Sequence, residues 1–245
     1  MKNLKKLSLL AASALLAVAF LAAGCGSDSA SSGSSSKNTT VTVGATPVPH
    51  GEILNEIKPL LAKEGVDLKV VEFTDYVKPN LALNDKELDA NFFQHSPYLD
   101  KFNSEHGTKL KSIAKIHVEP MGIYSHKIKD LKDLPDGAKV AIPNDPTNGG
   151  RALLILQSAG LIGLKDGGNI TSTVQDVEKN DKHLQFVELE AAQIPRSIDD
   201  VDIALINTNF AMEAGLNPLK DALFLEPKDS PYANVLVIRE GDENR

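Results

Sequence analysis

The sequence predicts an α/β protein with two similar lobes, each built on a mainly parallel sheet. Strand patterns alternate with helix patterns from residue 41 to residue 240, which is typical of this class. A weak internal duplication is also present. Segments 41–61 and 138–160 both run strand, proline-rich loop, helix, and segments 85–94 and 197–207 both run acidic turn, then strand. Two such halves favour a ligand crevice between the lobes, beyond the carboxyl ends of the strands.

The first half of the chain alternates strands with helices that have one apolar face. VTVGA (41–45) alternates in polarity and predicts a strand, and TPVPHG after it is a loop. The helix expected at 52–64 places Leu54, Ile57 and Leu61 on one face and ends at Gly65. The elements expected next are strand 68–73, helix 80–88, strand 89–94, helix 96–106 and strands 110–120 and 121–128.

The second half continues this alternation. Strand 138–143 leads through a loop rich in Pro, Asn and Gly into a helix that ends at Gly160. Strands 184–189 and 201–206 follow, separated by the short segment 190–200. A helix at 210–215 and a strand at 234–240 complete the pattern.

The loop before the helix that ends at Gly160 predicts an anion-binding site. Arg151 falls in the first turn of this helix, where free N–H groups and the helix dipole already favour negative charge. A cation at that position opposes the dipole. We therefore interpret Arg151 as an unpaired cation beside free amides and expect an anionic group to bind there.

Aromatic residues concentrate in one part of the chain. Half of the twelve lie within residues 73–102, and tryptophan is absent. On the strand ANFFQH, Phe93 and His95 share one face, while Phe92 and Gln94 take the other. One interpretation places Phe92 and Phe93 in two core layers. Because Gln94 and His95 are poor core residues, the alternative is a pocket wall, with Tyr76 at the equivalent place after the preceding strand.

Asparagines lie at several predicted strand ends. Asn144 and Asn148 flank the loop before the helix that ends at Gly160, Asn207 follows a strand, and Asn234 begins the last strand. A single asparagine at such a place is ordinarily a turn residue. Four of them, together with Arg151, indicate amide groups directed into a cleft.

The sequence gives little support for an enzyme, a metal site or a nucleic-acid-binding protein. The six histidines are scattered without an H-x-x-x-H pair, and neither G-x-S-x-G nor a phosphate-binding P-loop is present. Asp75 and Glu119 are the acids most suited to pairing, but surface acids are expected in so acidic a chain. The formal net charge of −7 disfavours nucleic acid and anionic lipid as partners. We expect no catalytic residue, metal or cofactor.

The first 40 residues predict export and anchoring. Three lysines precede an apolar run at 7–23, which ends in LAAGC with Cys25, the only cysteine. LAAGC resembles a bacterial lipobox, which implies that residues 1–24 are a lipoprotein signal peptide and that Cys25 is lipidated. The alternative is a retained membrane anchor, although the apolar run is at the short limit for one. Residues 25–40 are a tether rich in Ser and Gly.

The sequence resembles the methionine-binding lipoprotein family, the NlpA/MetQ-type solute-binding proteins of ATP-driven methionine importers. The resemblance covers residues 41–240. The segments that carry it are GATPVPHGEIL, EFTDYVKPNLALNDKELDANFFQHSPYL, HVEPMGIYS, AIPNDPTNGGRALLILQSAGLI, LEAAQIPRSIDDVDIALINTNFA and SPYANVLVIR.

This resemblance implies a type II periplasmic-binding-protein fold, in which two α/β lobes are joined by two crossover strands and close on a ligand in the cleft. Residues 41–118 with 228–245 would form lobe 1, and 119–227 lobe 2. The crossovers are expected near 117–120 and 226–230. Relatives continue beyond GDENR with another long helix, so lobe 1 is expected to lack a covering helix and to expose apolar surface. Lys86 stands where relatives commonly have glycine, with little effect expected.

The resemblance also implies the residues of the pocket. Arg151 would form two parallel hydrogen bonds with the α-carboxylate of an amino acid, a geometry that Lys cannot copy. The residues expected to line the thioether slot are Tyr76, Phe93, His95 and Tyr98. Those expected to hold the amino-acid backbone are Asn148, Arg151, Asn207 and Asn234. Asn144 is a further candidate, and Glu119 is the candidate partner of the ammonium group.

The function implied is that of an extracytoplasmic, lipid-anchored, monomeric protein that binds methionine, expected to be L-methionine, and delivers it to a permease–ATPase complex. One alternative is a relative that binds D-methionine, a methionine dipeptide or another small amino acid. Another is a surface adhesion lipoprotein without a transport role.

Overall fold

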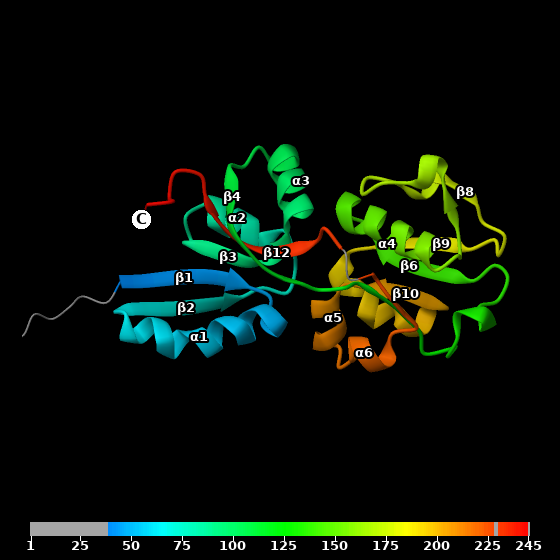
Figure 1. Cartoon of the computed structure of the whole chain (residues 1–245), viewed down its shortest axis with the longest axis horizontal. Helices are drawn as coiled ribbons and strands as arrows, with labels where there is room; N and C mark the ends of the chain where they lie inside the picture. The colour runs from blue at the N-terminus through cyan, green and yellow to red at the C-terminus, as the bar shows by residue number, and fades with distance from the viewer. Residues whose placement is uncertain (1–38, 228–229, 245) are drawn as a thin grey trace, which may run out of the picture. The chain divides into compact units, whose positions relative to one another are not determined.

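The computed structural model describes residues 39–227 and 230–244, and residues 37–245 form one compact unit. The predicted signal peptide, Cys25 and all but the last two residues of the tether lie outside the described residues, as do positions 228 and 229 of the second predicted crossover. Two mixed five-stranded sheets organise the unit (Figure 1).

The first sheet has the strand order β2-β1-β3-β12-β4. Its strands are β1 (Thr39–Ala45), β2 (Val66–Glu72), β3 (Ala90–His95), β4 (Leu110–Val118) and β12 (Ala233–Arg239). Its helices are α1 (Glu52–Lys63), α2 (Lys78–Asn84) and α3 (Ser96–His106), and the turn η1 (Pro47–Gly51) joins β1 to α1. Strand β1 runs parallel to β2 and β3, whereas β12 runs antiparallel to β3 and β4.

The second sheet has the order β11-β5-β10-β6-β9. Its strands are β5 (Gly122–Tyr124), β6 (Lys139–Pro143), β9 (Gln185–Leu189), β10 (Ile203–Ile206) and β11 (Phe224–Leu225). The helices α4 (Pro146–Ser158), α5 (Thr208–Glu213) and α6 (Pro218–Asp221) and the helical segment η5 (Ala191–Asp200) follow these strands. The short strands β7 (Gly163–Leu164) and β8 (Val177–Lys179) pair separately.

The expectation of mainly parallel sheets is wrong. In each large sheet two pairings are parallel and two are antiparallel. The physical reason is that β12 inserts between β3 and β4 from the far end of the chain, and β5 and β11 pair at one side of the second sheet. Each sheet draws its strands from the range expected for one lobe, but the exact lobe boundaries stay a prediction.

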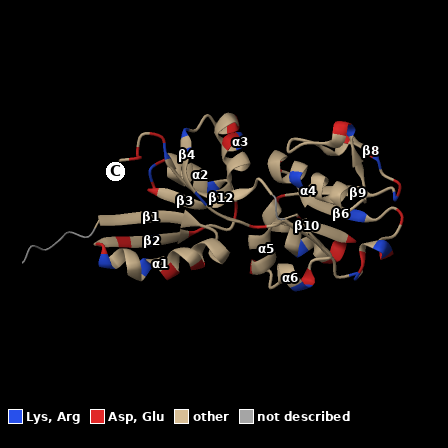
Figure 2. Cartoon of the chain, in the orientation of Figure 1, with Lys and Arg blue, Asp and Glu red and all other residues tan. Residues whose placement is uncertain are grey.

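Each sheet has apolar cores of its own, because its strands are buried by the helices that follow them. In the second sheet, Ile142 packs with Leu153 and Leu156 of α4 in one apolar cluster. Ile206 and Phe210 of α5 belong to a second cluster. In the first sheet, Phe92 belongs to the cluster of Val43, Leu54 and Leu68. Phe93 instead packs with Tyr98 and Phe102. Figure 2 shows Lys, Arg, Asp and Glu interspersed over the described chain.

One face of the first sheet remains open. The expected apolar face of α1 is only partly buried, since Ile57 is 38% exposed and Leu60 57% exposed. Together with Ile113 of β4 and Ile238 of β12, Ile57 lines an apolar groove that reaches Glu243. Apolar surface is therefore exposed on this sheet.

Two backbone positions bear on local stability. Lys86, which follows α2, has a φ of 66°, a left-handed conformation that glycine adopts more easily. Because of this conformation we expect Lys86 to lower stability relative to glycine, rather than to have little effect. Gly150 allows the first turn of α4 to approach the chain at Ile170, because an added Cβ would lie 2.2 Å from the Ile170 carbonyl oxygen.

Candidate functional site

A small cavity lies where elements from both sheets end. It is lined by Tyr76, Phe93, Gln94, His95, Tyr98, Glu119, Asn148, Arg151, Asn207, Thr208, Asn209 and Asn234. All eight residues expected to bind the ligand are in this set, and so is Glu119. Asn144 is not. It lies beside a neighbouring hollow, where its N–H donates to the Leu189 carbonyl (2.8 Å) and continues the pairing of β6 with β9.

The aromatic wall of the cavity comes mainly from the first sheet. The Tyr76 ring lies 5.7 Å from Phe93 and 4.8 Å from Phe210 of α5, centroid to centroid. Its hydroxyl donates to Asn209 Oδ1 (2.5 Å), and the Tyr98 hydroxyl donates to the Tyr76 carbonyl (3.0 Å). Burial raises the pKa of both tyrosines, so both remain neutral donors. This wall suits an apolar or polarizable group.

His95, the last residue of β3, is fixed as a neutral imidazole. Its Nδ1 accepts the N–H of Tyr98, so Nε2 carries the proton and donates to Asn148 Oδ1 (3.2 Å). Burial, helped by the nearby Arg151 cation, lowers the pKa of His95 to about 3. His95 therefore caps α3 and contacts the first turn of α4 without bringing charge into the site.

The helix end at α4 already has its own anion. Asp145 is the N-cap of α4, and its Oδ1 accepts the N–H of Asn148 (3.0 Å). The Asn148 amide donates to both Asp145 oxygens, and its Oδ1 accepts from Asn207 Nδ2 (2.9 Å). Burial raises the pKa of Asp145, and these hydrogen bonds oppose that rise. Asn207 Oδ1 is buried and accepts no hydrogen bond from the described residues, so it is an open acceptor at the cavity.

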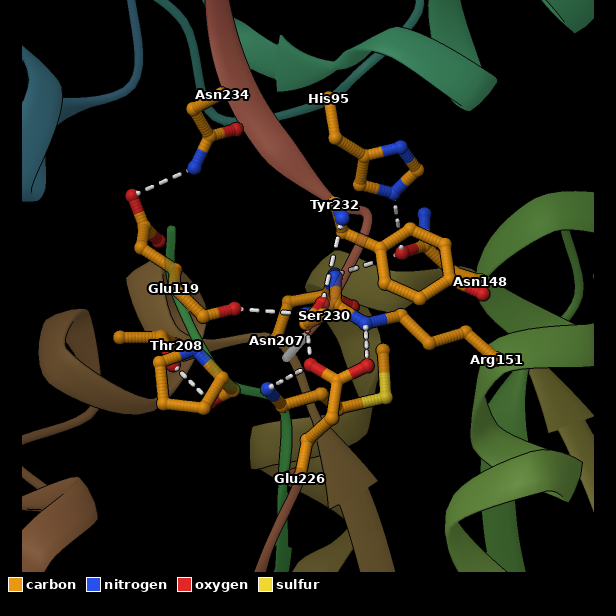
Figure 3. A network of polar contacts seen from close by, with 12 residues as sticks. His95, Glu119, Asn148, Arg151, Asn207, Thr208, Glu226, Ser230, Tyr232 and Asn234 are labelled. Carbon is orange, nitrogen blue, oxygen red and sulfur yellow. Dashed lines mark hydrogen bonds and ion pairs between the residues drawn. The ribbon is translucent and has the colours of Figure 1, made fainter. Parts of the chain in front are cut away.

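The interpretation of Arg151 as an unpaired cation is wrong. Its Nε and Nη2 donate to the two oxygens of Glu226 (3.0 and 2.5 Å), and Nη2 also donates to the Glu119 carbonyl (2.7 Å) (Figure 3). The guanidinium carbon lies 4.2 Å from the centre of the Tyr232 ring. The edge expected to bind a ligand carboxylate is thus occupied by Glu226. No described residue accepts a hydrogen bond from Nη1, and Arg151 lines the cavity.

Glu119 is brought to the cavity with two histidines from distant parts of the chain. Its Oε1 accepts from His117 Nε2 (2.5 Å) and Asn234 Nδ2 (3.0 Å), and His50 Nε2 lies 3.1 Å away. The ligand atoms of His50, His117 and Glu119 lie within 4.8 Å of one another, so these residues form a donor set that could hold a metal ion. Sequence spacing could not reveal this group, because its members come from η1, β4 and the segment after β4.

Several functional residues escaped the sequence reasoning. Glu226 and Tyr232 surround the Arg151 guanidinium, and Gln94, Thr208 and Asn209 line the cavity. Thr208 and Asn209 directly follow Asn207, so their place at the carboxyl end of β10 was the available signal. Glu226 offered no local signal, since it is one acid among many.

The arrangement can bind a small molecule that carries both charges. Arg151 Nη1 can donate to an anionic group, while Glu119 and Asn207 Oδ1 can accept from a cationic one. Glu226 already balances Arg151, whereas Glu119 has no Lys or Arg partner among the described residues and contacts only the histidines His50 and His117 as basic groups. The aromatic wall then faces the remaining, apolar part of the ligand.

Known proteins resemble this chain over most of its length. The D-methionine-binding lipoprotein MetQ of Salmonella typhi is 52% identical over 193 residues, which cover 77% of this chain and 71% of the relative. The periplasmic substrate-binding protein of an ABC transporter from Coxiella burnetii has 47% identity and a TM-score of 0.80, over 83% of this chain and 86% of that one. A nutrient-binding protein from Burkholderia cenocepacia, solved with methionine bound, has 48% identity and a TM-score of 0.79, over 84% and 87%.

These structures confirm the fold class that the resemblance implied, and the relatives are transporter binding proteins rather than enzymes. The family model described as NlpA lipoprotein matches residues 41–245. The chain therefore belongs to the NlpA lipoprotein family.

Proposed function

We propose that this protein is the substrate-binding component of an ABC importer and that its cavity binds methionine, expected to be L-methionine. The observation that carries the proposal is the convergence of an aromatic wall, an open guanidinium nitrogen and an unmatched carboxylate on one small cavity. These three features correspond to the thioether, the carboxylate and the ammonium group of methionine. The methionine bound to a relative with 48% identity supports the same ligand.

In this proposal the thioether lies against Tyr76, Phe93 and Tyr98, because sulfur packs favourably at the edges of aromatic rings. The α-carboxylate accepts from Arg151 Nη1, and the ammonium group donates to Glu119 and Asn207 Oδ1. Residues of the two sheets also bond directly to each other across the cavity, through Tyr76 with Asn209 and His95 with Asn148. Ligand binding stabilises this closed form, which the permease recognises.

The cellular role follows from the family and from the N-terminal segment. We place the protein outside the cytoplasm, anchored by lipid on Cys25, and acting as a monomer with a permease–ATPase complex. Among the described residues, every helix lacks the length or the apolar character needed to cross a bilayer. The importer role is tested together with the ligand, since an adhesion lipoprotein has no need for tight binding of a free amino acid.

The test is calorimetric titration of the compact unit from Lys37 onward, unfolded and refolded first to remove carried ligand. L-methionine, D-methionine, leucine and glycyl-methionine are titrated in turn. We expect saturable 1:1 binding, tightest for L-methionine. Tighter binding of another of these compounds would assign that ligand instead. No heat with any of them, from protein shown to be folded, would contradict the proposal.

Two asparagines provide a matched pair of variants. Asn207→Ala removes an open acceptor at the cavity and is expected to weaken binding at least tenfold, which corresponds to about 1.4 kcal/mol. Asn144→Ala, outside the cavity, should change affinity less than about twofold by the same reasoning. Equal losses in both variants would contradict the assignment of the cavity.

A further inference from the structure

One oxygen of Glu119 is surrounded by donors from the first sheet and its loops. Asn234 of β12 and His117 of β4 both donate to Oε1, and His50 of η1 faces the same atom. Glu119 lines the cavity, and none of the described residues donates a hydrogen bond to its second oxygen, Oε2. The carboxylate is thus held by one oxygen while the other remains available.

The hydrogen bond on the far side of His50 decides which of its nitrogens carries the proton. His50 is 1% exposed, and burial, with a smaller contribution from His117, lowers its pKa to about 4, so the ring is neutral at pH 7. Its Nδ1 lies 2.7 Å from Thr46 Oγ1. If Nδ1 carried the proton, the Nε2 lone pair would face the Glu119 carboxylate, which is electrostatically unfavourable. Thr46 therefore donates to Nδ1, and Nε2 carries the proton. Nε2 lies 3.1 Å from Glu119 Oε1 but makes no hydrogen bond with any described residue, so His50 acts on Glu119 by electrostatic contact.

His117 acts in the same direction from the opposite strand. Its Nε2 donates to Glu119 Oε1, while its Nδ1 is buried without a partner among the described residues. A proton on Nδ1 would be left unsatisfied, whereas a proton on Nε2 is satisfied by Glu119. The rings of His50 and His117 lie 5.3 Å apart and flank Phe92, which limits their movement. Both imidazoles then face the same oxygen of Glu119 and fix the direction of its carboxylate.

We propose that His50 and His117 are positioning residues, which orient Glu119 as the acceptor for the ammonium group of the ligand and so select compounds with a free amino group. The inference rests on the proposed function, because it assumes an amino acid in the cavity. Donors from separate elements are suited to this role, because His117 and Asn234 hold Oε1 from β4 and β12 and leave Oε2 for the ligand.

The test compares L-methionine with 4-(methylthio)butanoate, which has the same carboxylate and thioether but lacks the amino group. The readout is the ratio of the two dissociation constants. We expect the wild-type protein to prefer methionine at least tenfold, and Glu119→Gln to bring the ratio close to one. His117→Leu should lower the preference several-fold, because it should weaken the binding of methionine and leave the binding of 4-(methylthio)butanoate unchanged. His117→Gln, whose Nε2 replaces that of the ring, should restore it.

The outcomes separate this inference from the proposed function. If the wild-type protein binds neither compound, the proposed function fails. If the wild-type protein binds methionine and His117→Leu weakens both compounds in parallel, or leaves the ratio unchanged, the positioning role is wrong. Because His117 is a quarter exposed, its variants are expected to fold, and thermal unfolding checks this. His50→Gln, which keeps a polar N–H beside Glu119, should retain more preference than His50→Leu.

A metal ion is the competing explanation for the same three side chains. Methionine titrations in the presence of EDTA and of added zinc distinguish the two. We expect EDTA to leave the methionine affinity unchanged, because the hydrogen bonds need no ion. Loss of binding in EDTA that zinc restores would overturn the inference and assign His50, His117 and Glu119 as metal ligands.

Discussion

Replacing Arg151 by methionine tests whether this arginine stabilises the fold as well as the ligand. The side chains of Arg151 and Glu226 are 4% and 7% exposed and share two hydrogen bonds. Without the guanidinium, the Glu226 carboxylate keeps, among the described residues, only a weak donor, the N–H of Met121 at 3.3 Å. A buried carboxylate would then lack its partner, which is the costly way to break an ion pair.

The expected loss of stability is large. Removing one partner of a buried ion pair costs about 3–5 kcal/mol. For a domain of this size, each kcal/mol shifts the melting temperature by about 2–4 °C. The variant Arg151→Met should therefore melt about 6–20 °C below the wild type. Arg196→Met, which removes an exposed arginine, is the matched control and should stay within about 2 °C, since surface changes are within about 0.5 kcal/mol.

The double variant Arg151→Met, Glu226→Gln completes a thermodynamic cycle. Glutamine removes the unpaired charge and keeps an acceptor for Met121, so thermal unfolding of the ligand-free protein should recover at least half of the lost stability. Neither the single nor the double variant should bind the ligand L-methionine. Calorimetry on protein shown to be folded therefore separates the two roles of Arg151.

Two results would refute this reasoning. One is a single variant that is as stable as the wild type, which would mean that Glu226 does not depend on Arg151. The other is full methionine affinity in the refolded double variant, which would remove Arg151 from the ligand site.

Three further predictions follow from individual side chains. Lys86→Gly should raise stability by about 0.5–1 kcal/mol in thermal unfolding, because glycine relieves the left-handed φ of 66°. His95→Gln should reduce the slope of stability against pH between about pH 6 and pH 4. There the unfolded His95 is protonated and the folded one, with a pKa of about 3, is not, so His95 contributes a fall of about 1.4 kcal/mol in wild-type stability per pH unit of acidification, and buried His50 contributes in the same direction. Tyr76→Phe should weaken methionine binding about 3–10-fold by removing the bond to Asn209.

Each of these predictions has a specific check. Lys86→Ala keeps a Cβ at the strained position and should show no gain, so equal gains in both variants would exclude backbone strain as the cause. An unchanged slope in His95→Gln would mean that His95 is not buried as a neutral ring. Tyr124→Phe removes a buried hydroxyl that has no partner among the described residues, and it should leave affinity unchanged.

Local patterns were enough to locate most elements and the cavity. Alternation and helical spacing record which side of a segment is buried, so strands such as 41–45 and helices such as 96–106 were found near their observed bounds. The polar and aromatic residues at strand ends were informative because such ends meet at one edge of a sheet. Asn148 and Asn207 converge for that reason, and the end of β3 in the first sheet brings His95 to the same cavity. Asn144, one residue before the N-cap Asp145, does not line the cavity.

The sequence by itself determined the alternating elements, the family and most of the side chains that line the cavity. Only the tertiary structure decided their partners. Arg151 pairs with Glu226, which is 75 positions away in the chain. Glu119, which follows β4, contacts His50 of η1 and Asn234 of β12. Likewise, β12 returns to run antiparallel between β3 and β4. The physical reason is that periodicity and turn chemistry depend on neighbouring residues, whereas an ion pair or a strand pairing between distant segments leaves no trace in either segment alone.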